Sequence, residues 1–142
     1  MADEGGSFQL VVITPQRTVF DGVVQGVTAP GFLGQFGVLP GHIPYITAMK
    51  PGLLTFDHEG QTHRYVLGHG FAEVGTERVQ LLTERYEEAA SIDVADATAQ
   101  MQAAEKVMLE KEPSDPEYLD ARASQEIHSA RVIAGGGGAE KS

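Results

Sequence analysis

Short runs rich in β-branched and aromatic residues alternate with turn-forming residues through the first 90 positions of the chain. In the run over residues 62–67, His63 and Tyr65 share one face while Arg64 lies on the other. The runs that best fit strands are Phe8 to Thr14, Leu53 to Phe56, Thr62 to Leu67 and Val79 to Leu82. Turn signals recur every 6 to 11 residues, at Pro15, Asp21-Gly22, Pro30-Gly31, Pro40-Gly41, Pro51-Gly52, Glu59-Gly60, Gly68 to Gly70 and Gly75. Such spacing is typical of an antiparallel sandwich or barrel, and we predict an antiparallel β-sandwich domain over residues 1–90.

Beyond residue 90 the apolar positions recur at spacings of three and four, which is the period of an α-helix. The first helix is predicted to be capped by Asp93 and to end at Pro113, with Asp96 in its opening turn. Its apolar stripe consists of Val94, Ala97, Met101, Ala104 and Met108.

A second helix is predicted after Pro113, because Ser114 and Glu117 have the spacing of a capping box and Pro116 fits the first turn. Its apolar stripe consists of Leu119, Ala123, Ile127, Ala130 and Ala134, and Gly135 closes it. Residues 91–142 are therefore predicted to form an antiparallel two-helix hairpin with a flexible glycine-rich tail.

The alanine content of these two stripes predicts a weakly held hairpin. Alanine adds little apolar area, and burial stabilises by only about 25 cal/mol per Å². Two interpretations stay open on composition alone. In one the hairpin stays docked and stabilises the fold; in the other it opens and repacks on a partner.

Composition changes near residue 90 as well. Thirteen of the 17 glycines lie between Gly5 and Gly75, and nine of the ten Phe and Tyr residues lie at or before Tyr86. Residues 1–90 and 91–142 each carry 10 acidic and 5 basic residues, so net charge does not mark the change. The first 90 residues hold enough aromatic side chains to support a core of their own.

Charge and length exclude several classes of protein. The 142 residues carry a formal net charge of −10, which opposes binding to nucleic acid or anionic lipid. No apolar run is long enough to span a bilayer, so no direct membrane insertion is expected. With no cysteine, thiol catalysis and thiolate metal sites are excluded. The acidic start of the chain predicts a cytosolic protein without secretory or organellar targeting.

Three of the five histidines, His58, His63 and His69, fall within twelve residues. Imidazoles bind metals only where they converge with fixed orientation, and no matched carboxylate completes this set. A small metal-dependent β-barrel enzyme built on these histidines is one rival function. A helical adaptor on a sandwich scaffold is another.

Two further patterns offer little chemistry. Gly31, Gly34 and Gly37 lack the spacing and the following helix of a dinucleotide fingerprint, so they are interpreted as turn and packing residues. Glu84, Glu87 and Glu88 lie in polar sequence and are interpreted as a solvated linker rather than an acid–base pair.

The segment Gly34 to Pro44, GQFGVLPGHIP, combines rigid turn residues with apolar side chains. It is either a well-ordered loop or a preformed contact surface. Together with Lys50-Pro51-Gly52 it resembles the signature of the epsilon subunit of bacterial F-type ATP synthases. Leu10 to Pro15, Val19 to Gly22 and Gly70 to Val74 fit the same family, and the resemblance covers roughly residues 8–134.

The resemblance implies a non-catalytic rotor subunit of the central stalk, which needs no cofactor and helps to couple proton flow through the c ring to ATP synthesis. The sandwich is expected to dock on the gamma subunit and the c ring. Gln35 matches a position near the c-ring loops that is often acidic, and His42 matches a histidine near the gamma contact. The expected location is the cytoplasmic face of the bacterial inner membrane, as a peripheral part of the synthase. The expected partner contacts are Gln35, Phe36, Val38, Leu39, His42 and Ile43.

In this family the hairpin can fold against the sandwich or extend along gamma, where it inhibits ATP hydrolysis. Some members bind ATP at the start of the first helix through an Ile/Leu-Asp-x-x-Arg-Ala motif. Here Asp96 replaces the arginine, and because a carboxylate repels phosphates we expect no ATP binding. Between Ser114 and Ala134 the only bases are Arg122 and Arg131, which are the candidate regulatory contacts to the alpha and beta subunits.

Overall fold

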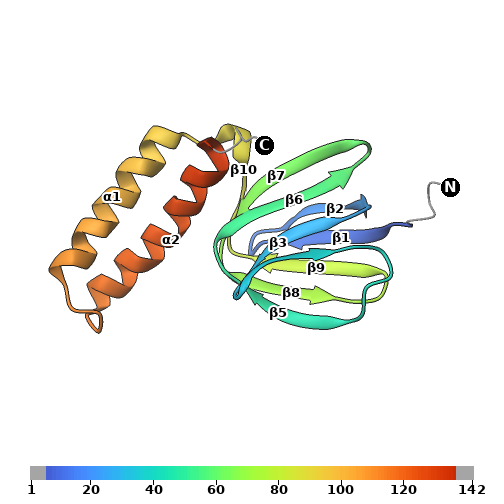
Figure 1. Cartoon of the computed structure of the whole chain (residues 1–142), viewed down its shortest axis with the longest axis horizontal. Helices are drawn as coiled ribbons and strands as arrows, with labels where there is room; N and C mark the ends of the chain where they lie inside the picture. Colours follow the sequence, from blue (N-terminus) through green and yellow to red (C-terminus); the bar gives the residue numbers. More distant parts are fainter. Residues whose placement is uncertain (1–5, 137–142) are drawn as a thin grey trace. The chain divides into compact units, whose positions relative to one another are not determined.

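The structure is a computed structural model that describes residues 6–136. The chain divides into two compact units, Met1–Glu87 and Glu88–Ser142, close to the change in composition near residue 90. Figure 1 shows that strands build the first unit and that two helices dominate the second. The strands are β1 Phe8–Ile13, β2 Thr18–Val24, β3 Val27–Gly31, β4 Gly34–Val38, β5 Tyr45–Met49, β6 Gly52–His58, β7 Gln61–Leu67, β8 Gly70–Val74, β9 Arg78–Thr83 and β10 Tyr86–Glu88.

The strands pair in the order β10-β7-β6-β3-β5-β8-β9-β1-β2, and β4, outside this order, also pairs with β3. β3 and β5 share a single residue pair, Gly31 with Met49, so the sheet turns there and closes into a sandwich (Figure 1). The predicted β-sandwich of short strands is confirmed.

One pairing departs from the predicted antiparallel pattern. β1 runs parallel to β9, with Gln9 opposite Arg78 and Ile13 opposite Leu82. The sequence predicted antiparallel pairs from the turns between neighbouring strands. β1 and β9 are neighbours in the sheet but are far apart in the sequence, so no hairpin turn sets their relative direction.

Large apolar side chains from both layers meet in the core. Leu10 on β1, Leu54 on β6 and Leu81 on β9 have no exposed surface. Phe20, Tyr65 and Tyr86 pack against this cluster, and the rings of Tyr65 and Tyr86 stack with their centroids 4.0 Å apart. The sandwich therefore has a hydrophobic core of its own.

Glycine is required at two kinds of position in the sandwich. The predicted turn between β6 and β7 places Glu59 and Gly60 at φ 54° and 79°, the left-handed region used by two-residue hairpins. At Gly70 the reason is a close approach, because a Cβ there would overlap the carbonyl group of Leu82 on the paired strand β9.

The helical unit begins with a short 3-10 turn, Ala89–Ser91, and the helix α1, Val94–Glu110. The segment around Glu87 and Glu88, expected to be a solvated linker, forms the short strand β10, in which Glu87 is half-buried and Glu88 is exposed. Asp93 caps α1 as predicted, because its side chain accepts a hydrogen bond from the backbone N–H of Asp96 at 3.0 Å.

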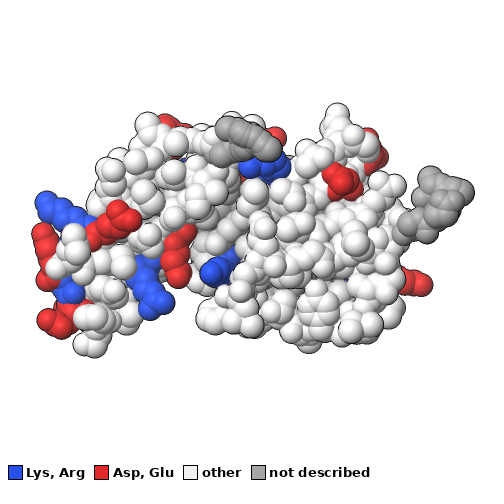
Figure 2. Space-filling model, in the orientation of Figure 1, with Lys and Arg blue, Asp and Glu red and all other residues white. Residues whose placement is uncertain are grey.

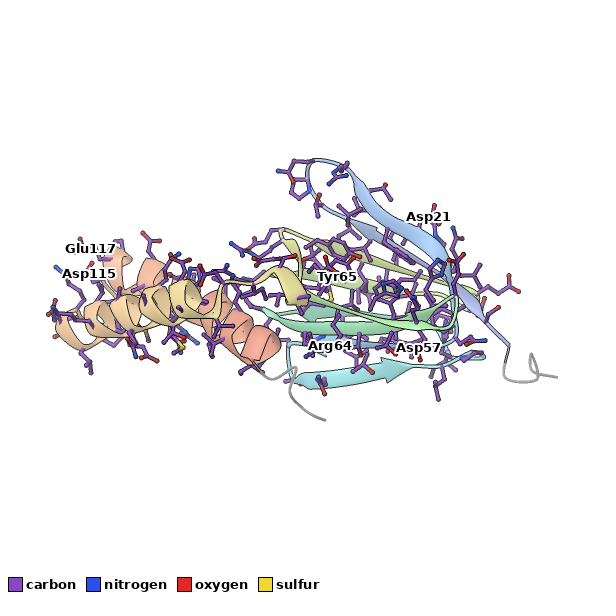
Figure 3. The ribbon with its side chains drawn as sticks, turned by 90° about the horizontal axis from the view of Figure 1, so that it is seen from above. Asp21, Asp57, Arg64, Tyr65, Asp115 and Glu117 are labelled. Carbon is purple, nitrogen blue, oxygen red and sulfur yellow. The ribbon has the colours of Figure 1, made fainter. Side chains whose placement is uncertain are left out.

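The second helix, α2, spans Pro116–Gly136, and Pro116 occupies its first position as predicted. The predicted cap at Ser114 is wrong. Asp115 instead accepts from the backbone N–H of Glu117 at 2.8 Å, at the start of α2 (Figure 3). The Glu117 side chain turns toward Lys111, whose Nζ lies 2.8 Å from Oε1, so it does not complete a capping box. The hydrogen bond to Glu117 raises the pKa of Lys111 above its ordinary value.

The end of α2 also differs from the prediction, because the helix continues through Gly135 to Gly136. In this helix every residue keeps helical backbone angles, which glycine can adopt at an entropic cost. The remainder of the predicted flexible tail, residues 137–142, lies outside the described residues.

The seam between the two helices is only partly the one predicted. Ala97 and Ala104 are buried in α1 as expected, and Ala134 is buried in α2. Leu119 and Ala123, however, are exposed, and the buried face of α2 carries Ala121, His128 and Arg131 instead. The prediction followed apolar residues alone and so missed polar side chains that pair inside the hairpin. Within residues 6–136, no helix is long and apolar enough to cross a membrane.

Candidate partner-binding surface

The β3–β4 hairpin and the loop that follows β4 position the residues proposed from the sequence. Gln35 lies opposite Pro30 and Val38 opposite Val27 across the two strands. Backbone hydrogen bonds from Phe32 to Ala48 and from Lys50 to Pro30, at 2.9 and 3.1 Å, join the turn end of this hairpin to the segment at and after β5. The loop between Val38 and Tyr45 therefore starts and ends on paired strands, which restrict the movement of its ends.

Burial along β4 alternates with the period of a strand. Gln35 points into solvent, whereas Phe36 is half-buried against the core and its ring lies 6.1 Å from that of Tyr45. Val38 is only 2% exposed and belongs to the core. The expectation that Val38 is available to a partner is therefore wrong, because the strand alternation turns its side chain inward.

The loop after β4 carries the most accessible of the predicted contacts. Leu39 is 69% exposed and Ile43 is 76% exposed. Gly41, between them, has a φ of 85°, which a residue with a Cβ rarely adopts. The turn thus holds two aliphatic side chains in solvent, and burying each against a partner stabilises a complex by about 2 kcal/mol.

His42 occupies a different position from its neighbours. Its ring lies edge-on to the buried ring of Phe8, with centroids 5.1 Å apart and planes at 83°. Both ring nitrogens are buried and have no hydrogen-bond partner among the described protein atoms. Burying an imidazole in this way costs about 1–3 kcal/mol relative to a satisfied one.

The sequence prediction missed two residues at the tip of the β3–β4 hairpin. Phe32 is 63% exposed and Leu33 is 98% exposed, the highest value among the large apolar side chains described. Their signal was present in the sequence, since two large apolar residues stand between Gly31 and Gly34 in a turn.

An open cavity of about 660 Å³ lies beside this surface, at the edge of the layer formed by β5, β8 and β9. Pro44, Tyr45 and Ile46 line one side of it, and Glu73 and Arg78 contribute opposite charges. Partial burial raises the pKa of the Tyr45 phenol above its ordinary value. The cavity extends the apolar surface from Ile43 toward the sheet.

The three clustered histidines do not converge. His58 and His63 have ring centroids 6.0 Å apart, but His58 donates from Nδ1 to the Val23 carbonyl at 2.8 Å and His63 stacks on Phe56. His69 follows the opposite end of β7, where its Nδ1 lies 3.8 Å from Glu84. Within the described part of the chain, no group of three or more His, Asp or Glu side chains is arranged to hold a metal.

The two arginines of α2 differ in exposure. Arg122 is exposed, whereas Arg131 is only 8% exposed. The guanidinium Nη1 of Arg131 lies 3.0 Å from His128 Nδ1 and 3.9 Å from a carboxylate oxygen of Asp96 on α1. Arg131 is therefore engaged inside the closed hairpin, contrary to its expected availability as a regulatory contact.

Charge is distributed unequally over the described surface. Figure 2 shows charged side chains of both signs gathered on the helical unit, while the visible part of the sandwich over β5 and β8 is largely uncharged. Exposed apolar residues on these strands and on β9 include Ile46, Phe71 and Leu82. An apolar, rigid sandwich surface is the kind of surface that binds a protein partner.

Comparison with known proteins gives a consistent result. The family described as "ATP synthase, Delta/Epsilon chain, beta-sandwich domain" matches residues 7–89. The ATP synthase epsilon chain of Geobacter sulfurreducens is 35% identical over 130 residues, covering 92% of this chain and 94% of that protein. The ATP synthase epsilon chain of Nitratidesulfovibrio vulgaris (strain DP4) is 37% identical over 127 residues, covering 89% and 95%.

Solved structures share the fold. A chain in the mitochondrial ATP synthase of Euglena gracilis, in a structure of OSCP, F1 and c-ring, aligns with a TM-score of 0.78 at 23% identity, covering 87% of this chain and 78% of that one. A chain in the central stalk and c-ring of the Tetrahymena thermophila mitochondrial enzyme aligns with a TM-score of 0.59 at 11% identity, covering 90% and 96%.

Proposed function

The chain belongs to the ATP synthase epsilon-chain family, and from that premise we propose that it is a non-catalytic rotor subunit whose sandwich attaches to the gamma subunit and the c ring of a proton-translocating F-type ATP synthase. Its task is to transmit rotation between the ring and the central stalk. The single observation that carries this proposal is the rigidly mounted apolar loop with Leu39 and Ile43 in solvent.

A subunit that transmits torque needs a surface that does not rearrange when it is loaded. The loop from residue 39 to residue 44 joins β4, which is paired with β3, to β5, which is paired with β8. These strands pack on a core of fully buried side chains. Partners that are preorganised in this way lose little conformational entropy on binding. A flexible loop with the same residues would transmit force poorly.

We assign the contacts as follows. Leu39, Ile43 and the half-buried Phe36 supply apolar area, and His42 supports the loop between Leu39 and Ile43 because its ring packs against Phe8. Gln35 faces the c ring from the solvent side of β4. Phe32 and Leu33, at the tip of the same hairpin, extend this contact.

The hairpin is proposed to regulate ATP hydrolysis through the alpha and beta subunits when it opens. The observation that favours this role is its small apolar seam, in which the buried apolar residues of α1 and α2 are alanines. Arg122 is exposed and is the arginine of α2 that the closed hairpin already offers. The proposed location is the cytoplasmic face of the bacterial inner membrane, as a peripheral subunit.

The test is binding of the full chain to an immobilised gamma–c-ring subcomplex from the same synthase. A double variant, Leu39→Asp with Ile43→Asp, places two charges in the proposed interface. The matched control is Leu109→Asp, which changes an 88% exposed leucine on α1. We expect the double variant to bind at least about a hundredfold more weakly, equal to about 2.7 kcal/mol, and the control to stay within about twofold.

Two results contradict the proposal. One is the absence of binding by the unmodified chain, which removes the rotor assignment. The other is unchanged affinity of the double variant, which moves the interface away from the loop.

A further inference from the structure

The outer face of β5, β8 and β9 carries a single carboxylate among apolar and neutral side chains. Residues that pair directly across neighbouring strands point to the same side of a sheet. Ala72, Val74 and Leu81 belong to the core, so the residues that alternate with them point outward. Glu73 is therefore the only charged residue in two neighbouring rows of this face. One row is Ala48, Phe71, Leu82 and Ile13, and the other is Ile46, Glu73, Gln80 and Val11.

The Glu73 carboxylate has no partner within the described part of the chain. Its side chain is exposed, and no hydrogen bond or ion pair joins it to another residue in the range 6–136. Its directly paired neighbours are Ile46, which is 69% exposed, and Gln80. Phe71, two residues earlier on β8, is 60% exposed. A protein partner that buries these apolar side chains buries the carboxylate with them.

Glu73 also lines the open cavity of about 660 Å³ that begins at Pro44, the residue after the exposed Ile43. Arg78 lines the same cavity, but its Nη2 donates to Oε1 of Gln80 at 3.0 Å. The cavity thus contains a cation with a polar partner and an anion with none. Electrostatic complementarity therefore favours a basic side chain from the partner over an acidic one.

We propose that Glu73 selects the partner of this face by pairing with a lysine or arginine that lies among apolar side chains on the gamma subunit. This rests on the proposed function, which assigns the c ring to Gln35 and to the tip of the β3–β4 hairpin. The β5–β8–β9 face, continuous with the loop at Ile43, is left for gamma. A surface that lacks the base would leave Glu73 desolvated and unpaired, which weakens the complex.

The test measures binding of the full chain to the immobilised gamma–c-ring subcomplex at about 0.05 M and about 0.3 M salt. Glu73→Gln removes the charge and keeps the shape of the side chain. We expect it to bind about tenfold more weakly than the parent at the lower salt concentration, and its affinity to fall less when salt is added. Glu73→Lys brings two cations together and should bind at least about a hundredfold more weakly.

Two controls separate this contact from general effects of charge. Glu77→Gln changes an exposed carboxylate of the same sandwich that does not line the cavity, and should stay within about twofold of the parent. Arg78→Gln removes the cation of the cavity and should not weaken binding by more than about twofold, because the partner's charge is positive. Since Glu73 makes no contact of its own within the described chain, Glu73→Gln should leave the midpoint of thermal unfolding unchanged.

Photocrosslinking identifies the subunit that covers the face. Phe71 is replaced by the photoreactive amino acid p-benzoylphenylalanine, and the assembled subcomplex is irradiated. Position 71 should become joined to gamma. A product that contains the c subunit instead would contradict the assignment of this face to gamma.

The role of Glu73 is contradicted if Glu73→Gln has the affinity and the salt dependence of the parent. It is also contradicted if Arg78→Gln is the variant that weakens binding, since the partner residue would then be acidic. Neither result removes the rotor assignment, provided that the unmodified chain binds and the Leu39→Asp, Ile43→Asp variant does not. Failure of the unmodified chain to bind would overturn the proposed function and this inference together.

Discussion

In the sandwich, leucine, valine and methionine side chains from facing layers are completely buried, whereas in the hairpin the buried apolar side chains of the two helices are alanines. The hairpin also buries Arg131 and His128, while the buried polar side chain of the sandwich, Thr83, is hydrogen-bonded to the backbone of Gly68 at 3.0 Å. Each fully buried leucine contributes about 2–3 kcal/mol and each alanine methyl group about 0.8 kcal/mol.

This difference separates two mechanical roles within one chain. A core of large interlocking side chains resists rearrangement, which suits a surface that must hold its shape under load. A seam of alanines buries little apolar area, which suits the opening of the hairpin proposed above. The rigid surface and the proposed switch therefore lie in different parts of the sequence.

The largest expected effect comes from the sandwich core. Leu54→Ala removes a side chain with no exposed surface and should lower the free energy of unfolding of the sandwich by about 3 kcal/mol. The comparison is Ala104→Gly in α1, which should cost about 1 kcal/mol and only in the helical unit. Urea unfolding followed by circular dichroism for the helices and, in a Tyr118→Phe background that leaves no tyrosine on α2, by tyrosine signals for the sandwich measures both. Equal losses in the two variants would contradict the difference in packing.

Backbone packing in the sandwich gives the next largest effect. Gly70→Ala forces a methyl group onto the carbonyl of Leu82 and should destabilise the sandwich by about 2 kcal/mol. Gly37→Ala is the matched control, because its new Cβ would meet nothing closer than 3.9 Å. Thermal unfolding of the two variants should therefore differ, and equal midpoints would show that β8 and β9 can move apart.

His42 tests whether a surface residue is placed for stability or for binding. His42→Leu removes the two unpartnered ring nitrogens and should raise the free energy of unfolding by about 1 kcal/mol. The same change should leave binding to gamma within about twofold, because the buried nitrogens are out of a partner's reach. Unfolding and binding are measured on the same preparation. A variant that is less stable, or that binds much more weakly, would contradict the supporting role of His42.

The smallest expected effect lies in the connection between α1 and α2, at the start of α2. Asp115→Ala removes the side chain that accepts from the Glu117 backbone and should cost about 0.5 kcal/mol of helical stability, at the low end for caps. Ser114→Ala should leave the helix unchanged. Amide exchange in the first turn of α2 distinguishes them, and the reverse order would restore the capping box expected from the sequence.

The strands and helices could be predicted because their signals are local. Residues such as Val79 and Tyr65 follow the period of a strand, and Pro116 identifies the start of a helix from its own backbone preference. The parallel pairing of β1 with β9 could not be predicted in this way, because it joins segments that no turn connects.

The surface was predicted less completely than the fold. The sequence identified the loop but could not separate Leu39, which is exposed, from Val38, which is buried, because the register of β4 against β3 decides between them. It treated Arg131 as available since its partner Asp96 lies more than thirty residues away. Which side chains meet across a helical hairpin depends on how the two helices align. The periodicity of apolar residues within each helix does not contain that information.

The most direct measurement is coupled ATP synthesis in membranes whose synthase has been depleted of this chain and then reconstituted. Three additions are compared: the full chain, a chain ending at Ser91, and the full chain with Leu39→Asp and Ile43→Asp. The full chain and the truncated chain should restore synthesis to within about twofold of each other, and the loop variant should not restore it. Restoration by the loop variant together with failure of the truncated chain would contradict attachment through the sandwich and assign it to the hairpin.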